Sequence, residues 1–299
     1  RVGNPAGGGI LITGLNLTRP VLFRGASRLP VYEAGETLAG AIAWLGVAAN
    51  VQAGTPYFIR LTGDETLNST WTLNNADLNL TLEGAGENRT INVAGVPAGD
   101  LVIYLGGSTL TLGNNLTLDG GGRNGRFIDI GSGSATLNLT GATLTGNNNN
   151  FSPGGAVYMS SGTFTMTGGA ITGNSSTVGG GAVYLQGASF TMTGGVISGN
   201  SSTGAQGGGG VWIGSGTFTM TGGAISGNTA ERGGGVSISS SSYTIHVAGG
   251  EISENTATGG VTGFGAQVYQ NFGSHYIDGD ITPPTTVDNY ETDDTNWEG

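Results

Sequence analysis

The sequence predicts an all-β protein, a single-stranded parallel β-helix with about 27 residues and three short strands in each coil. The first observation behind this prediction is a repeat: the twelve residues 163–174 recur almost unchanged at 189–200 and 217–228. Looser copies occupy residues 136–147 and 244–255, and the asparagines that close the five copies lie 27, 26, 28 and 27 residues apart. A fixed period in this range is typical of stacked structural units.

The second and third observations are the strand and turn signals inside each copy. Apolar and polar residues alternate over residues 163–167, the pattern of a half-buried strand, and two glycines then interrupt the run before a second strand at Ile171. A third strand at residues 156–159 is entered through glycines, which suit corners that need positive φ. A unit this short cannot bury an apolar face alone, so we expect successive coils to stack about 4.8 Å apart. The expected core columns are Phe164, Phe190, Phe218 and Ile245; Met166, Met192, Met220 and Val247; and Ile171, Ile197, Ile225 and Ile252.

Two segments precede the solenoid. Residues 1–32 hold two apolar runs, 10–18 and 20–23, that do not fit the repeat. Two interpretations stay open: strands packed along the same solenoid, or a strand donated to a neighbouring subunit. Residues 33–54 contain a predicted helix at 37–49, with Glu33 and Glu36 where the helix dipole favours acids. Apolar residues recur along it at helical spacing, so we expect it to cap the first coil.

The rest of the chain continues the solenoid and then leaves it. Residues 55–133 read as irregular early coils, and residues 134–280 as the regular repeats. Residues 281–299 form an acidic tail whose charges and prolines discourage further strand pairing.

Composition excludes several classes of function. The 299 residues include 61 glycines and no cysteine, so there is neither a disulfide framework nor a thiolate metal site. The net charge of −11 argues against nucleic acid, which is bound through basic patches. No run of 18 apolar residues occurs, so we expect no membrane span. A surface rich in Thr, Ser, Asn and Gly suits an extracellular or cell-surface protein.

Catalysis and metal binding are both disfavoured by the distribution of acidic and basic residues. Polysaccharide lyases and hydrolases need clustered carboxylates, yet residues 131–277 contain no aspartate, and Glu251 and Glu254 have no basic partner nearby. His246 and His275 each stand among neutral residues, so we expect no metal and no cofactor. The early coils carry one mixed cluster, which favours loop salt bridges over a catalytic site: Asp119, Arg123, Arg126 and Asp129.

Two polar columns follow from the repeat. Stacked amides can hydrogen-bond from coil to coil, so the closing asparagines predict an inward-facing structural ladder of Asn147, Asn174, Asn200, Asn228 and Asn255. If the core columns point inward, threonines point outward as a flat array, which either orders water against ice or reflects the β-propensity of threonine on an exposed sheet. Asn138, Ser189 and His246 interrupt this array.

A third column is aromatic. Tyr158, Tyr184 and Trp212 each lie between two aliphatic residues that suit the core, so we expect the rings to face outward as a stripe. Exposed apolar stripes often mark interaction sites. Three roles stay open: a protein–protein contact, a platform for stacking a glycan, or a ladder that stabilises the solenoid itself.

Two short motifs carry a family resemblance. Gly-Gly-Ala-Val occurs at residues 154–157 and 180–183, and Ile-x-Gly-Asn occurs at 171–174 and 225–228. In these motifs the chain resembles the right-handed parallel β-helix repeat proteins of bacterial surfaces. It is similar to the repeats of chlamydial polymorphic outer membrane proteins and to repetitive spirochaete-type surface proteins. The resemblance covers most of residues 34–280 and implies right-handed coils and a surface location.

Together these observations predict a non-enzymatic extracellular structural protein, a rod of about eight coils that associates with itself into a filament, sheath or surface layer. The main alternative is a monomeric cell-surface adhesin or carbohydrate-binding β-helix, with a glycan or a host or cell surface as its partner. Further alternatives are a polysaccharide lyase or hydrolase and an ice-binding protein.

Overall fold

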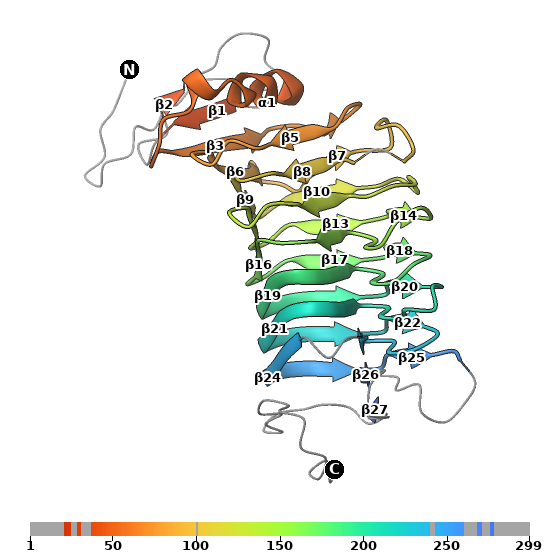
Figure 1. Cartoon of the computed structure of the whole chain (residues 1–299). Coiled ribbons are helices and arrows are strands. Elements are labelled where there is room, and N and C mark those ends of the chain that lie inside the picture. Colours follow the sequence, from red (N-terminus) through yellow and green to blue (C-terminus); the bar gives the residue numbers. More distant parts are fainter. Residues whose placement is uncertain are drawn as a thin grey trace.

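A computed structural model shows a parallel β-solenoid of about 7 turns spaced about 27 residues apart, which confirms the predicted fold class (Figure 1). The expected rod of about eight coils differs little from this number. The structure describes residues 21–24, 29–30, 37–99, 101–239, 243–259, 268–270 and 276–277.

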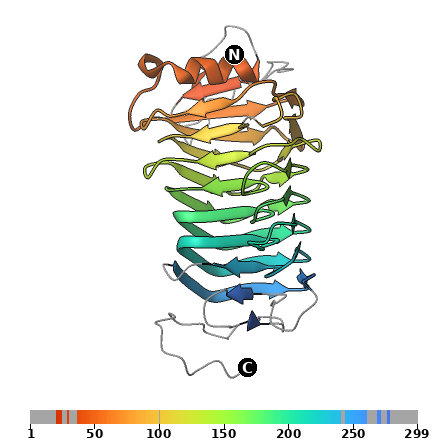
Figure 2. The same cartoon turned by 45° about the vertical axis from the view of Figure 1, so that its right-hand side comes forward.

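The solenoid has three walls, to each of which a coil contributes one strand (Figures 1 and 2). The hydroxyl wall, named for its outward side chains, contains β3 (Pro56–Leu61), β6 (Asn79–Gly84), β9 (Thr109–Leu112), β12 (Thr136–Leu139), β16 (Thr163–Met166) and the middle parts of β19 (Val183–Ser198), β21 (Val211–Ser226) and β24 (Tyr243–Ser253). The corner wall contains β4 (Glu65–Thr66), β7 (Arg89–Asn92), β10 (Leu116–Asp119), β13 (Thr143–Thr145), β17 (Ala170–Thr172) and the ends of β19, β21 and β24. The aromatic wall contains β5 (Trp71–Leu73), β8 (Ile103–Leu105), β11 (Ile128–Ile130), β15 (Val157–Met159), the starts of β19 and β21, β23 (Val236–Ile238) and β26 (Val268–Gln270).

A separate small sheet lies beside the regular coils. It joins five two-residue strands in parallel: β14 (Asn148–Asn149), β18 (Ser175–Ser176), β20 (Ser201–Ser202), β22 (Thr229–Ala230) and β25 (Thr256–Ala257). Each of these strands begins directly after a ladder asparagine, so the turn at the asparagine leads the chain into this sheet.

The core consists of the predicted in-register columns. Phe164, Phe190 and Phe218 pair strand to strand and are fully buried. The first two rings stack with centroids 4.6 Å apart, and the second two lie 5.1 Å apart. The long strands β19, β21 and β24 differ from the expected separate short strands. Pairing between β19 and β21 and between β21 and β24 continues around the corners through register shifts, as at a β-bulge, so the strands are joined.

Helix α1 (Leu38–Gly46) covers the first coil at the N-terminal end of the stack (Figure 1). Thr37 caps it by accepting a hydrogen bond of 3.1 Å from the Gly40 backbone N–H, and a 3-10 helix, η1 (Ala48–Asn50), follows. Its buried face is Leu38, Ala41, Ile42 and Leu45. The predicted helix was slightly too long at its C-terminal end. Glu33 and Glu36 lie outside the described residues.

Strand β1 (Val21–Arg24) closes the edge of the first coil. It pairs antiparallel with β3 of the same chain and with β2 (Leu29–Pro30). The second apolar run of the N-terminal segment therefore packs on its own solenoid in this structure, and the first run lies outside the described residues.

The far end of the aromatic wall also finishes with an antiparallel strand. β27 (Tyr276–Ile277) pairs with β26, which reverses the direction of the sheet at this edge. The acidic tail, residues 281–299, lies outside the described residues.

Candidate functional site

The aromatic column forms a continuous stack on the aromatic wall. Tyr158, Tyr184 and Trp212 are in register on successive coils. The ring centroids of the two tyrosines lie 5.6 Å apart, and those of Tyr184 and Trp212 lie 3.9 Å apart, with interplanar angles of 21° and 17°. Such offset stacks stabilise a structure by about 0.5–1.5 kcal/mol per pair beyond area burial.

The expectation that these rings are exposed is wrong for two of the three. Tyr184 and Trp212 are each 4% exposed, whereas Tyr158 is partly exposed. The rings leave the core but lie flat against each other and against the backbone. A Cβ on Gly214 would lie 2.3 Å from Cη2 of Trp212, so only glycine fits beside this ring. The side chain of Gln206 hydrogen-bonds to Tyr184. Burial raises the pKa of the Tyr184 hydroxyl to about 12.

An arginine and an aspartate extend the stack toward the N-terminus. The guanidinium carbon of Arg126 lies 4.0 Å from the centroid of the Tyr158 ring, a cation–π contact. Nη1 of Arg126 donates a hydrogen bond of 2.6 Å to Oδ2 of Asp129. Asp129 is buried and lies in the column between Tyr104 and Tyr158. Burial raises the pKa of Asp129, and the hydrogen bond and charge of Arg126 oppose this rise.

The remaining members of the mixed cluster hold loops together. Arg123 donates hydrogen bonds to the backbone oxygens of Val96, Pro97 and Arg126, which ties one coil to the next. Oδ1 of Asp119 accepts a hydrogen bond of 2.9 Å from the backbone N–H of Gly121. These contacts favour the loop interpretation of the cluster.

The asparagine column lies inside the solenoid and links every regular coil to its neighbours. The side chain of Asn200 illustrates the pattern. Its Oδ1 accepts from the backbone N–H and Nδ2 of Asn174 at 3.0 and 3.1 Å, and its Nδ2 donates to Oδ1 of Asn228 at 3.0 Å. Nδ2 also donates to the backbone oxygen of Ile171 in the preceding coil at 2.9 Å. All five asparagines are buried, at Asn147, Asn174, Asn200, Asn228 and Asn255.

The ladder has a first rung. Oδ1 of Asn147 is buried and accepts no hydrogen bond from the described residues, because the preceding coil has no asparagine to donate to it. The polarity of the ladder is therefore fixed. The side-chain oxygens of Asn174, Asn200, Asn228 and Asn255 accept from the asparagine of the preceding coil, and the amide nitrogens of Asn174, Asn200 and Asn228 each donate to both neighbouring coils.

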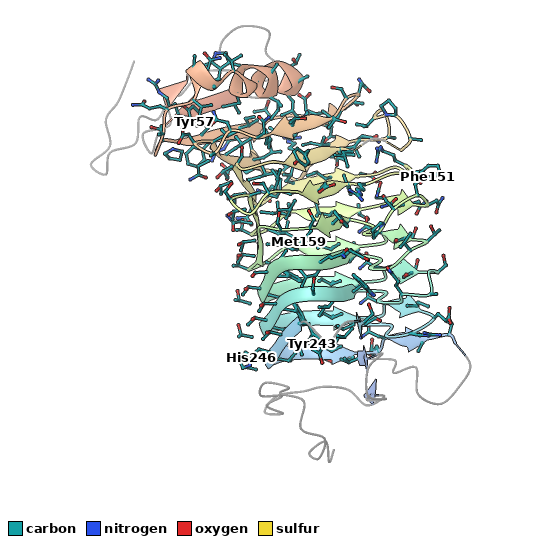
Figure 3. The ribbon with its side chains drawn as sticks, viewed as in Figure 1. Tyr57, Phe151, Met159, Tyr243 and His246 are labelled. Atoms are coloured by element: carbon teal, nitrogen blue, oxygen red, sulfur yellow. The ribbon has the colours of Figure 1, made fainter. Side chains whose placement is uncertain are left out.

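The outward side of the hydroxyl wall is a surface of polar side chains in register. The two outward positions on successive strands form two files in register. One file is Asn79, Thr109, Thr136, Thr163, Ser189, Thr217 and Thr244; the other is Thr81, Thr111, Asn138, Thr165, Thr191, Thr219 and His246. Figure 3 labels His246 at the last coil of this wall. The three interruptions expected from the sequence all fall within these files.

Sequence reasoning missed Glu65, which lies 27 residues beyond Leu38 in the chain and beside it in the fold. Burial raises the pKa of Glu65, and a hydrogen bond from the backbone of Leu38, the first residue of α1, opposes this rise. No local pattern predicts this contact, since it joins the first coil to the helix above it.

Among the described residues, histidines, aspartates and glutamates do not gather in any group able to hold a metal ion. Within the same part of the chain, no helix is long and apolar enough to cross a membrane.

Comparisons with known proteins give no match: no protein-family model, no curated protein and no solved structure matches this chain.

Proposed function

We propose that this protein is a non-enzymatic, extracellular structural rod that associates with copies of itself along its sides. The observation that carries this proposal is the covering of the first coil at one end of the stack and of the aromatic wall at the other. Antiparallel strand β1 and helix α1 cover the first coil, and antiparallel β27 ends the aromatic wall. Covered edges discourage strand-to-strand joining end to end. The long walls are left for contact.

The construction of the interior supports a mechanical role. Each coil is joined to the next by parallel strand pairing in all three walls, and the regular coils are also joined by buried asparagine amides that hydrogen-bond from coil to coil. In a stacked solenoid stability grows by nearest-neighbour interfaces, so an unbroken ladder gives a stiff unit. The mixed cluster of the early coils also stabilises the solenoid, since Arg126 binds Asp129 and Arg123 donates to three backbone oxygens.

The corner wall offers a surface suited to contact with another copy. Its outward file contains the apolar side chains of Ala170, Val196 and Ala224, in register on three coils, and Val196 is 38% exposed. Exposed apolar side chains in a row favour association. The proposal also includes an extracellular or cell-surface location and a relationship to chlamydial and spirochaete-type repeat proteins. Both rest on the likeness of the repeats.

The rival interpretation, a monomeric adhesin or carbohydrate-binding β-helix, relies on exposed rings. Tyr184 and Trp212 are covered, so only Tyr158 offers part of a ring face to a sugar. The geometry favours the third role weighed for this column, a ladder that stabilises the solenoid.

Sedimentation velocity over a range of protein concentrations tests the proposal. We expect species larger than the 29.8 kDa chain, increasing with salt because the net charge of −11 opposes close approach of copies. Val196→Arg should reduce association, while Ser198→Arg, on the same strand in the neighbouring file, serves as the matched control. A single monomeric species at every concentration and salt would overturn the proposal.

Removal of residues 1–32 gives a second test. Since β1 pairs with β3 of its own chain, the truncation exposes the edge of β3, and we expect association to increase. Conversion of large particles to monomers on truncation would instead support strand donation between subunits.

A further inference from the structure

The hydroxyl wall carries side chains whose hydrogen-bonding groups are unused. In the three consecutive coils of β16, β19 and β21, the outward positions are Thr163, Thr165, Ser189, Thr191, Thr217 and Thr219. None of these six hydroxyl groups makes a hydrogen bond to another described residue. Each is partly or largely accessible to solvent. Because these hydroxyls are accessible and have no partner among the described residues, they can hydrogen-bond to water or to an external partner.

Their positions are fixed. The strands pair in register through several coils, and the core phenylalanines and methionines lie directly behind them. Threonine is branched at Cβ and therefore stiff at χ1. Groups held rigidly before binding lose little conformational freedom when a partner arrives, which favours association through many weak contacts.

The spacing of the files suits water. Hydroxyls on adjacent coils are separated by the strand spacing of about 4.8 Å. Two oxygens that share one tetrahedral water at hydrogen-bond distances of about 2.75 Å lie about 4.5 Å apart. One water can therefore bridge each pair of neighbouring coils. A row of such bridges repeats along the rod with the period of the solenoid.

The chemistry of the wall excludes other classes of partner. From β9 to β24 the two files contain no aspartate, glutamate, lysine or arginine, although the chain as a whole has a net charge of −11. Phosphate groups of nucleic acids and anionic lipids, and charged mineral surfaces, find no counter-charge there. From β9 to β24 the files also contain no tyrosine, tryptophan or phenylalanine ring on which a sugar could stack.

The size of the wall disfavours a protein partner. Seven coils at the strand spacing and two files of side chains give a face of roughly 30 Å by 12 Å. That is less than half of the roughly 800 Å² per partner that a stable protein–protein interface buries. A partner that matches the wall is instead neutral, hydrogen-bonding, flat and periodic.

We propose that the hydroxyl wall binds ice. The wall orders a layer of water that spans its threonine files, and this layer joins the lattice of an ice surface. Thr163, Thr165, Ser189, Thr191, Thr217 and Thr219 form its centre, because Asn138 and His246 interrupt the files on either side. This activity is independent of side-by-side association, which is assigned to the corner wall.

Partitioning into slowly grown ice tests the proposal on the full chain. The wild type should be enriched in the ice fraction relative to an unrelated soluble protein in the same sample. The double variant Thr165→Tyr, Thr191→Tyr, which places bulky side chains in one file on adjacent coils, should lower that enrichment about tenfold, the factor that corresponds to one or two hydrogen bonds.

The matched control is Thr172→Tyr, Ser198→Tyr on the corner wall of the same two coils, which should change the enrichment less than about twofold. Thermal unfolding identifies any variant that fails to fold. Wild type excluded from ice like the reference protein would overturn the proposal, as would equal losses in both folded double variants. Two other results would also overturn it. Retention on crystalline cellulose or chitin without enrichment in ice would assign the wall to a polysaccharide. Dissociation of oligomers by the hydroxyl-wall variant alone would assign the wall to contact with a second copy of the chain.

Discussion

The residue before each ladder asparagine takes a left-handed backbone conformation. Gly173, Gly199 and Gly227 have φ of 64°, 62° and 63°, and Glu254 has φ of 55° at the same position of the last regular coil. This conformation brings the asparagine inward at a tight corner. For a residue with a side chain it costs about 1–2 kcal/mol, because Cβ approaches the following carbonyl oxygen.

Replacement of Glu254 by glycine should therefore stabilise the protein by about 1 kcal/mol, since the release of strain exceeds the added freedom of the unfolded chain. The midpoint of urea unfolding measures the change. Gly227→Ala is the reciprocal variant: a Cβ there has no atom closer than 4.0 Å, so its expected loss of stability comes from the backbone alone. A destabilising Glu254→Gly would show that the glutamate side chain outweighs the strain.

Loss of a ladder amide should lower the free energy of unfolding by a large amount for a small side chain. Asn200→Ala removes the acceptor of the buried Asn174 backbone N–H, and it takes one hydrogen bond each from Nδ2 of Asn174 and from the oxygen of Ile171. Each such loss costs about 1–3 kcal/mol, so we expect a loss of about 2–5 kcal/mol in the free energy of unfolding. Chemical denaturation measures it. The exposed Asn150 provides the control, and Asn150→Ala should change stability by less than about 0.5 kcal/mol.

At the scale of the element, strand β11 carries a buried charge whose effect depends on pH. Burial raises the pKa of Asp129 above its usual 3.8, and Arg126 opposes the rise only in part. Because the folded pKa is raised, the folded state binds the proton more tightly than the unfolded state. The ionised form thus costs stability at neutral pH, and this cost disappears as the pH falls through the raised pKa.

Asp129→Asn resembles the protonated carboxyl, so it should remove this dependence. The free energy of unfolding of the variant minus that of the wild type should decrease as the pH is lowered from about 7 to about 4. Urea unfolding at several pH values measures the difference. Arg126→Gln removes the opposing group and should shift the change to higher pH. A difference that grows as the pH falls would contradict the sign of the shift.

The periodic elements follow from the sequence, and the elements that deviate from the period do not. Each core column was predictable because a fixed repeat and alternating polarity place Phe164 and its equivalents on one face. The burial of Tyr184 and Trp212 was not, because it depends on the glycine backbone beside the rings and on Gln206 from a loop. The pairing of β1 with β3 joins two segments that share no sequence pattern, so the sequence did not predict which strand β1 pairs with.

At the scale of the whole molecule, the three walls divide the chemistry of the rod. The hydroxyl wall carries two files of polar side chains, the corner wall carries an apolar file, and the aromatic wall carries the stacked rings. All three depend on one register, because each coil passes through every wall in turn. Removal or addition of a whole coil should therefore preserve the walls. Removal of part of a coil shifts the following strands into the wrong wall and should destroy them.

Deletion of residues 175–200 tests this directly. The deletion removes 26 residues, the separation of Asn174 from Asn200, and joins Asn174 to Ser201. Phe164 then faces Phe218, Tyr158 faces Trp212, and Asn174 bonds to Asn228, so every wall keeps residues of the same kind in register. Because solenoid stability is roughly a sum over neighbouring units, we expect a folded protein of reduced stability. Circular dichroism and urea unfolding measure this.

Deletion of residues 188–200 is the contrasting variant. It removes half a coil, including the hydroxyl-wall and corner-wall parts of β19, so the strand of the aromatic wall would run directly into the small sheet. The two interfaces on either side of the missing half-coil lose their partners, and the core columns of Phe164 and Ile171 are interrupted. We expect this shorter deletion to be far more destabilising than the longer one. If the longer deletion proved the more damaging, stability would depend on the number of residues removed and not on the phase of the coil.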